Sequence, residues 1–259
     1  MNHTISCTYV GHSTCFLKVG NCNLITDPHF SKRTLLLKRA KPLAIQPETL
    51  PDMDAILLSH MHFDHFNIRS YKYLSVRTPI IIPEGCASLI SQYLPNPIVE
   101  LSHFSNYKMP DGIEITAIPV SHFSFRILPF RYRKSNAYLI KDTNSNSTVF
   151  FCGDSAYTED FTQIGDAEDI DLALLPVGGY APRFLMKFNH MTPAEAVQSF
   201  EDLRAKFFIP IHHGTFRLSL ESLGEPVKWL EKIMSEREDF KEKIKILDQG
   251  KTFDIPSKK

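Results

Sequence analysis

Short apolar runs alternate with polar segments along most of the chain. Runs rich in valine, isoleucine and phenylalanine, bounded by glycine, proline or asparagine, are typical of strands. Strands are predicted at residues 4–10, 12–18, 23–26, 55–58, 79–83, 113–120, 138–141, 148–152, 170–177 and 207–211, with a last strand or pair within 244–254.

Helical patterns are fewer and come later. Thr192, Pro193 and Glu195 form a capping box with proline at the first helical position, which predicts a helix over residues 192–205. Further helices are predicted at residues 68–76, 86–94 and 225–240. Strands come early in each half of the chain and helices late, which favours two packed β-sheets with helices on their outer faces. Because no linker, low-complexity tract or repeat is visible, residues 1–259 are predicted to form a single domain.

The composition excludes several classes of protein. Hydrophobic residues make up 43% and charged residues 22% of the chain, as in an ordinary globular protein. Lysine plus arginine equals aspartate plus glutamate at 29 each, so no net field attracts nucleic acid and no nucleic-acid partner is expected. The five cysteines form no C-x-x-C pair, and no signal peptide or membrane-length apolar run is visible. A cytoplasmic protein is expected.

The densest polar cluster follows the apolar run 55–58. His60, His62, Asp64 and His65 lie within six residues, directly after a predicted buried strand. Alternate side chains of an extended segment share a face, so His60 and His62 point the same way, and a turn would bring Asp64 and His65 to an adjacent position. Imidazoles with a carboxylate suit Zn²⁺, with Mn²⁺ or Fe²⁺ as alternatives, and the arrangement can serve two divalent metal ions. The alternative is a histidine-rich surface loop.

Three further polar side chains follow predicted strands: His122, Asp154 and His212. They can converge with the cluster at one sheet edge, although Asp154 could instead form an Asx-turn. His12 and Asp27, also at strand ends, could orient the metal ligands or cap the local backbone.

The order H-x-H-x-D-H, then H, D and H resembles the metallo-β-lactamase superfamily. This resemblance implies an α+β fold of the αββα four-layer sandwich type, with two mixed β-sheets packed face to face and helices outside. It also implies a dinuclear site, with His60, His62 and His122 on one metal, Asp64, His65 and His212 on the other, and Asp154 between them. Histidine at position 62, where the diiron flavodiiron branch generally carries glutamate, favours hydrolysis over redox chemistry.

Within this superfamily the chain is similar to the N-acyl-phosphatidylethanolamine-hydrolysing phospholipase D group and its bacterial relatives. The shared segments are residues 10–14, 24–28, 153–157, 180–196 and 211–216. The resemblance implies that His190 contacts the substrate or assists the leaving group. The sequence departs from the group at His213, where relatives often have tryptophan, at Ala181, where they often have an acid, and in residues 123–134, which lack a tryptophan-rich pattern.

The expected activity is that of a metal-dependent hydrolase. A bridging hydroxide would attack phosphorus or a carbonyl carbon, with Asp64 and Asp154 fixing its position and His190 or a metal-bound water protonating the leaving group. A phosphodiesterase, phospholipase D-like, acting on a small-molecule or lipid-like phosphodiester is the first hypothesis. A lactonase or esterase acting on a phosphorylated or acylated small molecule is the alternative. A nuclease and a non-catalytic metal-binding protein are two further hypotheses, from other functional classes of protein.

Candidate substrate-binding residues are Arg126, Arg183, Lys187 and Tyr157, and the basic ones could grip a phosphate. Residues 30–43 carry five cations and three consecutive leucines without an acid. They are interpreted as a contact with a membrane surface or an anionic substrate, or as a solvated segment with an apolar anchor. A homo-oligomer is compatible with the sequence.

Overall fold

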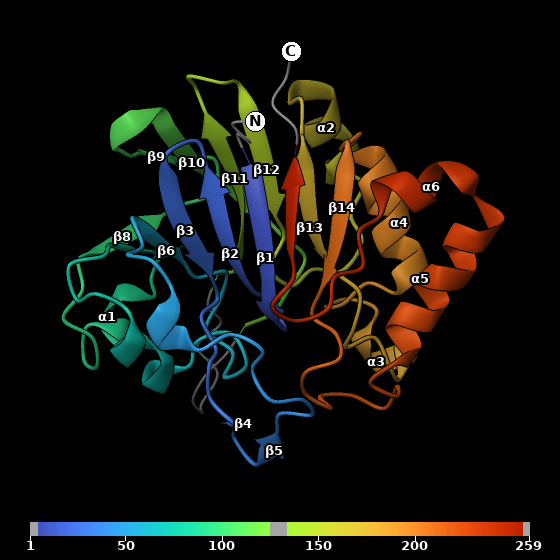
Figure 1. Cartoon of the computed structure of the whole chain (residues 1–259), viewed down its shortest axis with the longest axis horizontal. Coiled ribbons are helices and arrows are strands. Elements are labelled where there is room, and N and C mark those ends of the chain that lie inside the picture. Colours follow the sequence, from blue (N-terminus) through green and yellow to red (C-terminus); the bar gives the residue numbers. More distant parts are fainter. Residues whose placement is uncertain (1–4, 125–133, 256–259) are drawn as a thin grey trace.

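Two mixed β-sheets pack face to face in the computed structural model, which describes residues 5–124 and 134–255 (Figure 1). The seven-stranded sheet has the order β15 (Thr252–Ile255), β1 (Ile5–Gly11), β2 (Thr14–Val19), β3 (Cys22–Thr26), β6 (Ala55–Leu57), β7 (Ile80–Pro83), β8 (Ile98–Leu101). The six-stranded sheet has the order β14 (Phe207–Ile211), β13 (Leu172–Pro176), β12 (Ser147–Phe151), β11 (Asn136–Asp142), β10 (Ile113–Pro119), β9 (Asn106–Lys108). A separate hairpin joins β4 (Arg33–Thr34) and β5 (Leu37–Lys38).

Each sheet is antiparallel on one side and parallel on the other. Strands β15, β1, β2 and β3 pair antiparallel, whereas β3, β6, β7 and β8 pair parallel. In the second sheet β9 to β12 are antiparallel and β12, β13 and β14 are parallel. Parallel strands end at the same sheet edge, so the residues that follow them lie together.

Alternation along the strands divides the apolar side chains between three cores. On β13, Leu172 and Leu174 face the core between the sheets, while Ala173 and Leu175 face the helices outside. On β6, Leu57 enters the central core, whereas Ile56 belongs to the outer core of its own sheet. Successive strand side chains point to opposite faces, so strands buried on both sides require continuous apolar runs.

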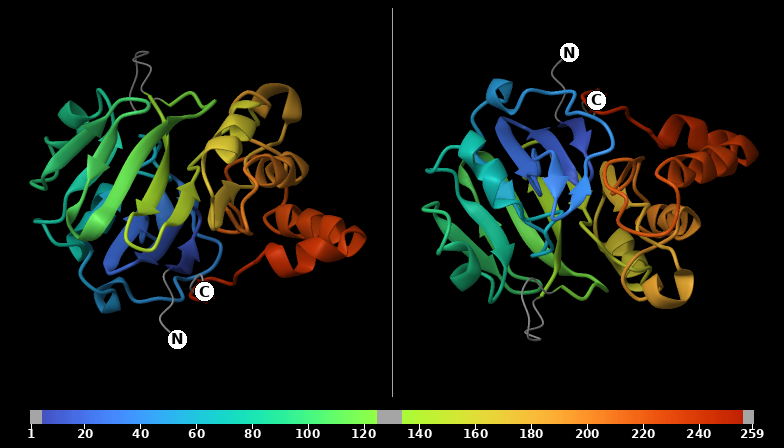
Figure 2. Two further views of the ribbon diagram at one scale, coloured as in Figure 1. Left: turned by 90° about the horizontal axis from the view of Figure 1, so that it is seen from above. Right: turned by 90° about the horizontal axis from the view of Figure 1, so that it is seen from below.

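Helices cover the outer faces of both sheets. The described helices are η1 (Pro47–Thr49), η2 (Ile68–Tyr73), α1 (Ala87–Ile90), η3 (Pro110–Gly112), α2 (Asp160–Ala167), α3 (Arg183–Met186), α4 (Pro193–Asp202), α5 (Glu225–Glu236) and α6 (Glu238–Lys243). Helices α2, α4, α5 and α6 pack on the six-stranded sheet, and η2 and α1 pack on the other (Figure 2). The predicted four-layer α+β sandwich is thereby confirmed.

Several element predictions were wrong in detail. The helix predicted over residues 225–240 is broken at Arg237, whose backbone is extended and whose guanidinium binds Glu201 and Asp239. The predicted helix 68–76 is a shorter 3-10 helix, and the predicted helix 86–94 reduces to α1. Helices α2 and α3 and strand β8 were not predicted, because short elements carry too few periodic positions to be recognised. Within 244–254 most residues are irregular, and the last strand begins at Thr252.

The cysteines and the helices add two findings. All five cysteines are buried and free, and Cys7, Cys15 and Cys22 pack in the central core. In the part of the chain that the structure describes, none of the helices has the length and apolar character required to span a membrane.

Candidate metal centre

A group of histidines and aspartates lies at the edge of the sandwich where several strands end. His60 follows β6 by three residues, His122 follows β10 and Asp154 follows β12, and His212 comes directly after β14. After Met61 the chain turns, and the backbone N–H groups of His65 and Phe66 both donate to the carbonyl of His62. This turn moves Asp64 and His65 away from the face that His60 and His62 share.

The first group consists of His60, His62 and His122. His60 Nε2 lies 3.0 Å from His62 Nδ1, and His122 Nε2 lies 3.2 Å from the same atom. His60 and His122 are buried. These distances are compatible with three ligands of one small cation, because a Zn–N bond is about 2.0–2.1 Å long.

Hydrogen bonds on the far side of two rings fix which nitrogen faces the centre. The Ser59 hydroxyl donates to Asp27 Oδ2 at 2.6 Å, so it accepts from His60 Nδ1 at 2.9 Å. His122 Nδ1 donates to the carbonyl of Asn189 at 2.9 Å. In the neutral rings, Nε2 of His60 and Nε2 of His122 therefore present lone pairs to the space between them.

The electrostatic environment keeps this first group uncharged. Burial, together with the neighbouring histidines, holds the pKa of His60 well below its usual range. Burial and His122 lower the pKa of His62 to about 4, and burial lowers that of His122. Neutral imidazole is the form that binds a metal ion.

The second group consists of Asp64, His65 and His212. Asp64 Oδ2 lies 3.4 Å from His65 Nε2 and 3.4 Å from His212 Nε2. Asp154 Oδ2 lies 3.2 Å from each of the same two nitrogens. Asp154 Oδ2 is also 3.8 Å from His60 Nε2 and 4.0 Å from His122 Nε2, so one carboxylate oxygen faces both groups.

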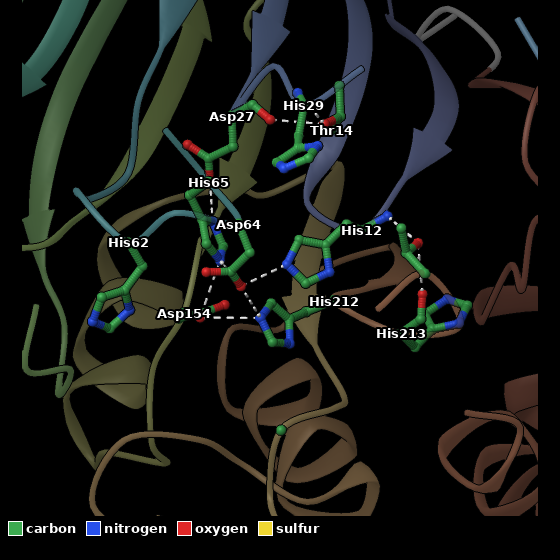
Figure 3. A network of polar contacts seen from close by, with 12 residues as sticks. His12, Thr14, Asp27, His29, His62, Asp64, His65, Asp154, His212 and His213 are labelled. Carbon is green, nitrogen blue, oxygen red and sulfur yellow. Dashed lines mark hydrogen bonds and ion pairs between the residues drawn. The ribbon is translucent and has the colours of Figure 1, made fainter. Parts of the chain in front are cut away.

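Two residues outside these groups hold the second one in place (Figure 3). His12 Nε2 contacts Asp64 Oδ2 at 2.8 Å. His65 Nδ1 contacts Asp27 Oδ2 at 2.6 Å, and Asp27 Oδ1 accepts from the backbone N–H of Ser59. Of the two roles left open by the sequence for His12 and Asp27, the contacts support orientation of the candidate ligands.

Three residues at the same place have a strained backbone. His12, Asp27 and His212 have φ values of 59°, 35° and 59°, in the left-handed region that residues other than glycine rarely adopt. Each such residue costs roughly 1–3 kcal/mol, and it persists only where the surrounding structure enforces it. The strained residues directly support or contribute to the candidate ligand set.

The second group carries opposite charges. Burial opposes the charged state of His65, but Asp154, Asp64 and Asp27 raise its pKa well above the usual value. Burial likewise opposes charge on His212, and Asp154 raises its pKa to about 9. Burial is outweighed again at Asp154, whose pKa is held well below its usual range by His212 and His65. Positive charge at this place is therefore favoured, whether it comes from protons or from a cation.

The donors present fit a metal centre. His65 Nε2, Asp154 Oδ1 and both ring nitrogens of His212 are buried without a hydrogen bond of normal geometry. Unsatisfied buried polar atoms are costly and rare, and here they belong to side chains that lie together, since Asp154 Oδ2 is 3.2 Å from His65 Nε2 and from His212 Nε2. Nitrogen and carboxylate oxygen ligands suit Zn²⁺ first, so the residue types and the orphaned atoms agree.

His190 lies beside this centre. Its Nδ1 is 3.9 Å from Asp154 Oδ2, and its ring centroid is 5.1 Å from that of His122. Burial holds its pKa well below the usual range, so the ring is neutral. Gly179 packs against the ring, because a Cβ atom there would lie 2.9 Å from His190 Nδ1.

The structure separates the four predicted substrate-binding residues from the centre or does not describe them. Arg126 lies outside the described residues. Arg183 donates to the carbonyl of His190 at 2.7 Å and pairs with Glu195, so it positions the His190 segment. Lys187 is exposed and lies over the ring of Phe188. Tyr157 donates to Asp202 of α4 at 2.8 Å and packs at the outer core.

A cavity of about 260 Å³ opens onto the candidate metal centre. Its lining residues are Thr34, Leu35, Leu37, His62, Phe63, Asp64, Asp154, Gly179, Met186, His190, His212, Leu218 and Ser219. Arg183, Lys187 and Tyr157 are absent from this lining. The outer wall is mainly apolar and comes from three segments that are far apart in the sequence.

Sequence reasoning missed Ser59 and Asn189. Ser59 links His60 to Asp27, and the Asn189 carbonyl fixes the ring of His122. Ser59 stands between the apolar strand and the histidine cluster, a position that could have suggested it. Asn189 acts through its backbone, so its residue type carries no signal.

Comparison with known proteins identifies the relatives of this arrangement. A family model described as a beta-lactamase superfamily domain matches residues 22–213. An uncharacterised protein of Mycobacterium tuberculosis is 34% identical over 239 residues, which cover 87% of this chain and 63% of that protein. The mitochondrial N-acyl-phosphatidylethanolamine-hydrolysing phospholipase D of Saccharomyces cerevisiae is 32% identical over 257 residues, covering 95% of this chain and 55% of that protein. The chain thus spans less than two thirds of these curated relatives.

Other relatives match over nearly their whole length. A metal-dependent hydrolase of Pyrobaculum aerophilum is 28% identical over 255 residues, covering 95% of this chain and 94% of that protein. Among solved structures, a protein of Veillonella parvula described as a possible metal-dependent hydrolase superimposes with a TM-score of 0.81 at 15% identity, covering 98% of this chain and 100% of that one. This structural likeness shows the fold.

Proposed function

The chain belongs to the beta-lactamase superfamily, and from this premise we propose that it is a metal-dependent hydrolase that uses two metal ions to cleave phosphodiester bonds. The observation that carries the proposal is the position of Asp154 Oδ2, which lies within 3.2–4.0 Å of nitrogens from both histidine groups. A carboxylate in this position is suited to join two cation sites.

The proposed ligands divide into two sets. His60, His62 and His122 would hold one cation, and Asp64, His65 and His212 the other, with Asp154 shared. Two bound cations, with Zn²⁺ the first choice, would lower the pKa of a shared water and stabilise charge on the attacking and leaving oxygens.

The protein's own groups would position the reactants. Asp64 and Asp154 would orient the nucleophilic water, because a carboxylate oxygen of each lies 3.2–3.4 Å from His65 Nε2 and His212 Nε2. His190 lines the cavity next to Asp154 and has an unpartnered Nδ1. Because its ring is neutral, it would contact the substrate, take up the proton released by the attacking water and then pass that proton to the departing oxygen.

The cavity supports a substrate with an apolar part. Leu35, Leu37, Phe63, Met186 and Leu218 line its outer wall. The relatives that are named as N-acyl-phosphatidylethanolamine-hydrolysing phospholipases D make a lipid-like phosphodiester the first choice. The centre would act on the phosphorus while the apolar wall contacts a chain or aromatic group.

The test compares two classes of bond. Protein loaded with Zn²⁺, and separately with Mn²⁺ or Fe²⁺, is assayed against bis-p-nitrophenyl phosphate, phosphatidylethanolamine analogues and a panel of lactones and carboxylic esters. Turnover of the phosphodiesters that is abolished in the Asp64→Ala variant is the expected result. Turnover confined to lactones or esters would replace the phosphodiesterase proposal with the lactonase alternative.

A further inference from the structure

Apolar side chains project into solvent from three segments around the mouth of the cavity. Leu36 in the β4–β5 hairpin is 88% exposed, Phe184 in α3 is 73% exposed, and Leu220 in the segment before α5 is 71% exposed. Leu35, Leu185 and Phe188 are also more than half exposed. Large apolar side chains gathered in this way mark a surface that binds a partner.

The three segments are joined around the same opening. Residues of the hairpin, of α3 and of the segment 218–219 all line the cavity at the metal centre. The Leu220 N–H donates to the Ala181 carbonyl, and the Ala40 N–H donates to the Thr215 carbonyl. The hairpin and α3 lie at the end of the molecule away from the two termini (Figure 1). We call these segments, residues 32–41, 183–188 and 217–220, the rim.

Cations accompany the apolar side chains of the rim. A second cavity of about 830 Å³ lies beside the hairpin, and among the described residues its lining contains five cations and no acid. Lys32, Arg33, Lys38 and Lys41 are exposed, whereas Arg39 donates to the His29 carbonyl. Lys187 and Arg217 are exposed on the other two segments. Glu221, the nearest acid in the chain beyond Arg217, is engaged by the backbone N–H groups of Gly179 and Ala181.

We propose that the rim docks onto the surface of an anionic lipid bilayer. Exposed leucine and phenylalanine side chains would enter the boundary between headgroups and acyl chains, while the cations would contact lipid phosphates. A second copy of this chain is a poorer occupant, because a twofold contact would bring the same cations opposite one another. The inference deepens the proposed function, since the cavity would then open toward a membrane that contains its substrate.

Binding to vesicles tests the inference without requiring turnover. Zinc-loaded protein is sedimented with vesicles of phosphatidylcholine, and with vesicles of an equimolar mixture of phosphatidylcholine and phosphatidylglycerol. Binding to the mixed vesicles at least about 25-fold stronger than to phosphatidylcholine is expected, because each cation near an anionic surface contributes about fivefold and at least two contribute. Absence of binding to the mixed vesicles would overturn the inference and leave the phosphodiesterase proposal standing.

Matched variants locate the docking surface. Phe184→Ser and Leu36→Ser should each weaken vesicle binding about tenfold, because each removes one inserted apolar side chain. Phe104→Ser is the control: Phe104 is 75% exposed, close to the 73% of Phe184, but lies between the edge strands β8 and β9. Neither Leu36 nor Phe184 lines the cavity, so hydrolysis of bis-p-nitrophenyl phosphate should be unchanged. Equal weakening by Phe104→Ser would contradict the inference.

Charge variants separate lipid docking from self-association. Lys32→Gln with Lys38→Gln should weaken binding to mixed vesicles about 25-fold and leave binding to phosphatidylcholine unchanged. Lys18→Gln, near the far end of β2, is the control. Sedimentation without lipid completes the test: a dimer that Leu36→Ser converts to monomer, with no vesicle binding by wild type, would assign the rim to a second copy.

Discussion

The candidate metal centre and the rim around its mouth are neighbours with opposite physical character. In the centre, His60 and His65 are fully buried and their rings are fixed by hydrogen bonds. In the rim, Leu36 is almost fully exposed and its hairpin strands are two residues long. From this difference we expect the centre to determine the class of reaction and the rim to determine which molecule reaches it.

The largest expected effect comes from the residue that joins both groups. Asp154→Ala should lower zinc content and kcat/KM together, by more than the roughly 10–100-fold that supporting residues contribute. Zinc per chain is measured by mass spectrometry after gel filtration. Asp142→Ala, which removes a buried carboxylate at the end of β11, is the control and should retain full zinc content. Full zinc content in Asp154→Ala would show that Asp154 does not hold the metal, which would contradict the proposed role of the centre and its distinction from the rim.

His190 should affect catalysis without affecting the metal. His190→Gln is expected to lower kcat by roughly 100-fold to 10,000-fold for an alkyl leaving group, because general acid catalysis is lost. The loss should be smaller for p-nitrophenol, which leaves without a proton. Steady-state kinetics with both leaving groups, at unchanged zinc content, checks this. The same loss for both leaving groups would exclude a proton-donating role.

Asp27 is a residue that positions the candidate ligands and is not itself proposed as a ligand, so its substitution should weaken metal binding less than the loss of a ligand does. Asp27→Asn should weaken zinc binding roughly 10–100-fold, because the amide cannot accept from both Ser59 and His65 as the carboxylate does. Competition with a zinc chelator measures the affinity. Unchanged affinity would mean that the contact between Asp27 and His65 serves only the fold.

The pH dependence of metal binding should follow the second group. In the metal-free protein the pKa of His212 is raised to about 9 and that of His65 is raised, so both rings are protonated at neutral pH. Zinc must displace these protons, so its affinity should rise by about tenfold per pH unit for each proton displaced. Calorimetry in buffers of different ionisation enthalpy counts the protons. Binding without proton release would contradict the described electrostatics.

The rim should produce the smallest effect on chemistry. Leu37→Ala removes an apolar side chain from the cavity wall and should raise KM for a lipid-like substrate about three- to tenfold, with kcat unchanged. KM for bis-p-nitrophenyl phosphate should change less. A loss in kcat equal to that of His190→Gln would show that the rim belongs to the chemical machinery.

The contrast between the metal centre and the rim also explains which features of the site could be predicted from the sequence. The candidate ligands follow strands that end at one edge of the sandwich, β6 in one sheet and β10, β12 and β14 in the other. Residues 60–65 also form one local motif, so the convergence of the ligands could be expected, although not that two sheets supply them. The contacts of Arg183 and Tyr157 could not be predicted, because their partners Glu195 and Asp202 lie on α4, and only the packing of that helix brings them together. The residues of the cavity wall could not be predicted either. Leu35, Met186 and Leu218 are brought together by loops, which leave no periodic pattern in the sequence.

The fold shows the same limit. Long apolar strands were predicted because strands buried on both faces need continuous apolar runs. The division of residues 225–243 into α5 and α6 depends on Arg237, whose tertiary contacts with Glu201 and Phe240 hold an extended backbone where local propensity would continue the helix.

The most direct test of the metal centre is anomalous diffraction from a crystal of zinc-loaded protein, measured on both sides of the zinc absorption edge. The account predicts two peaks about 3.5–4 Å apart, one among His60, His62 and His122 and the other among Asp64, His65 and His212, with Asp154 between them. A single peak, or peaks away from these side chains, would contradict it.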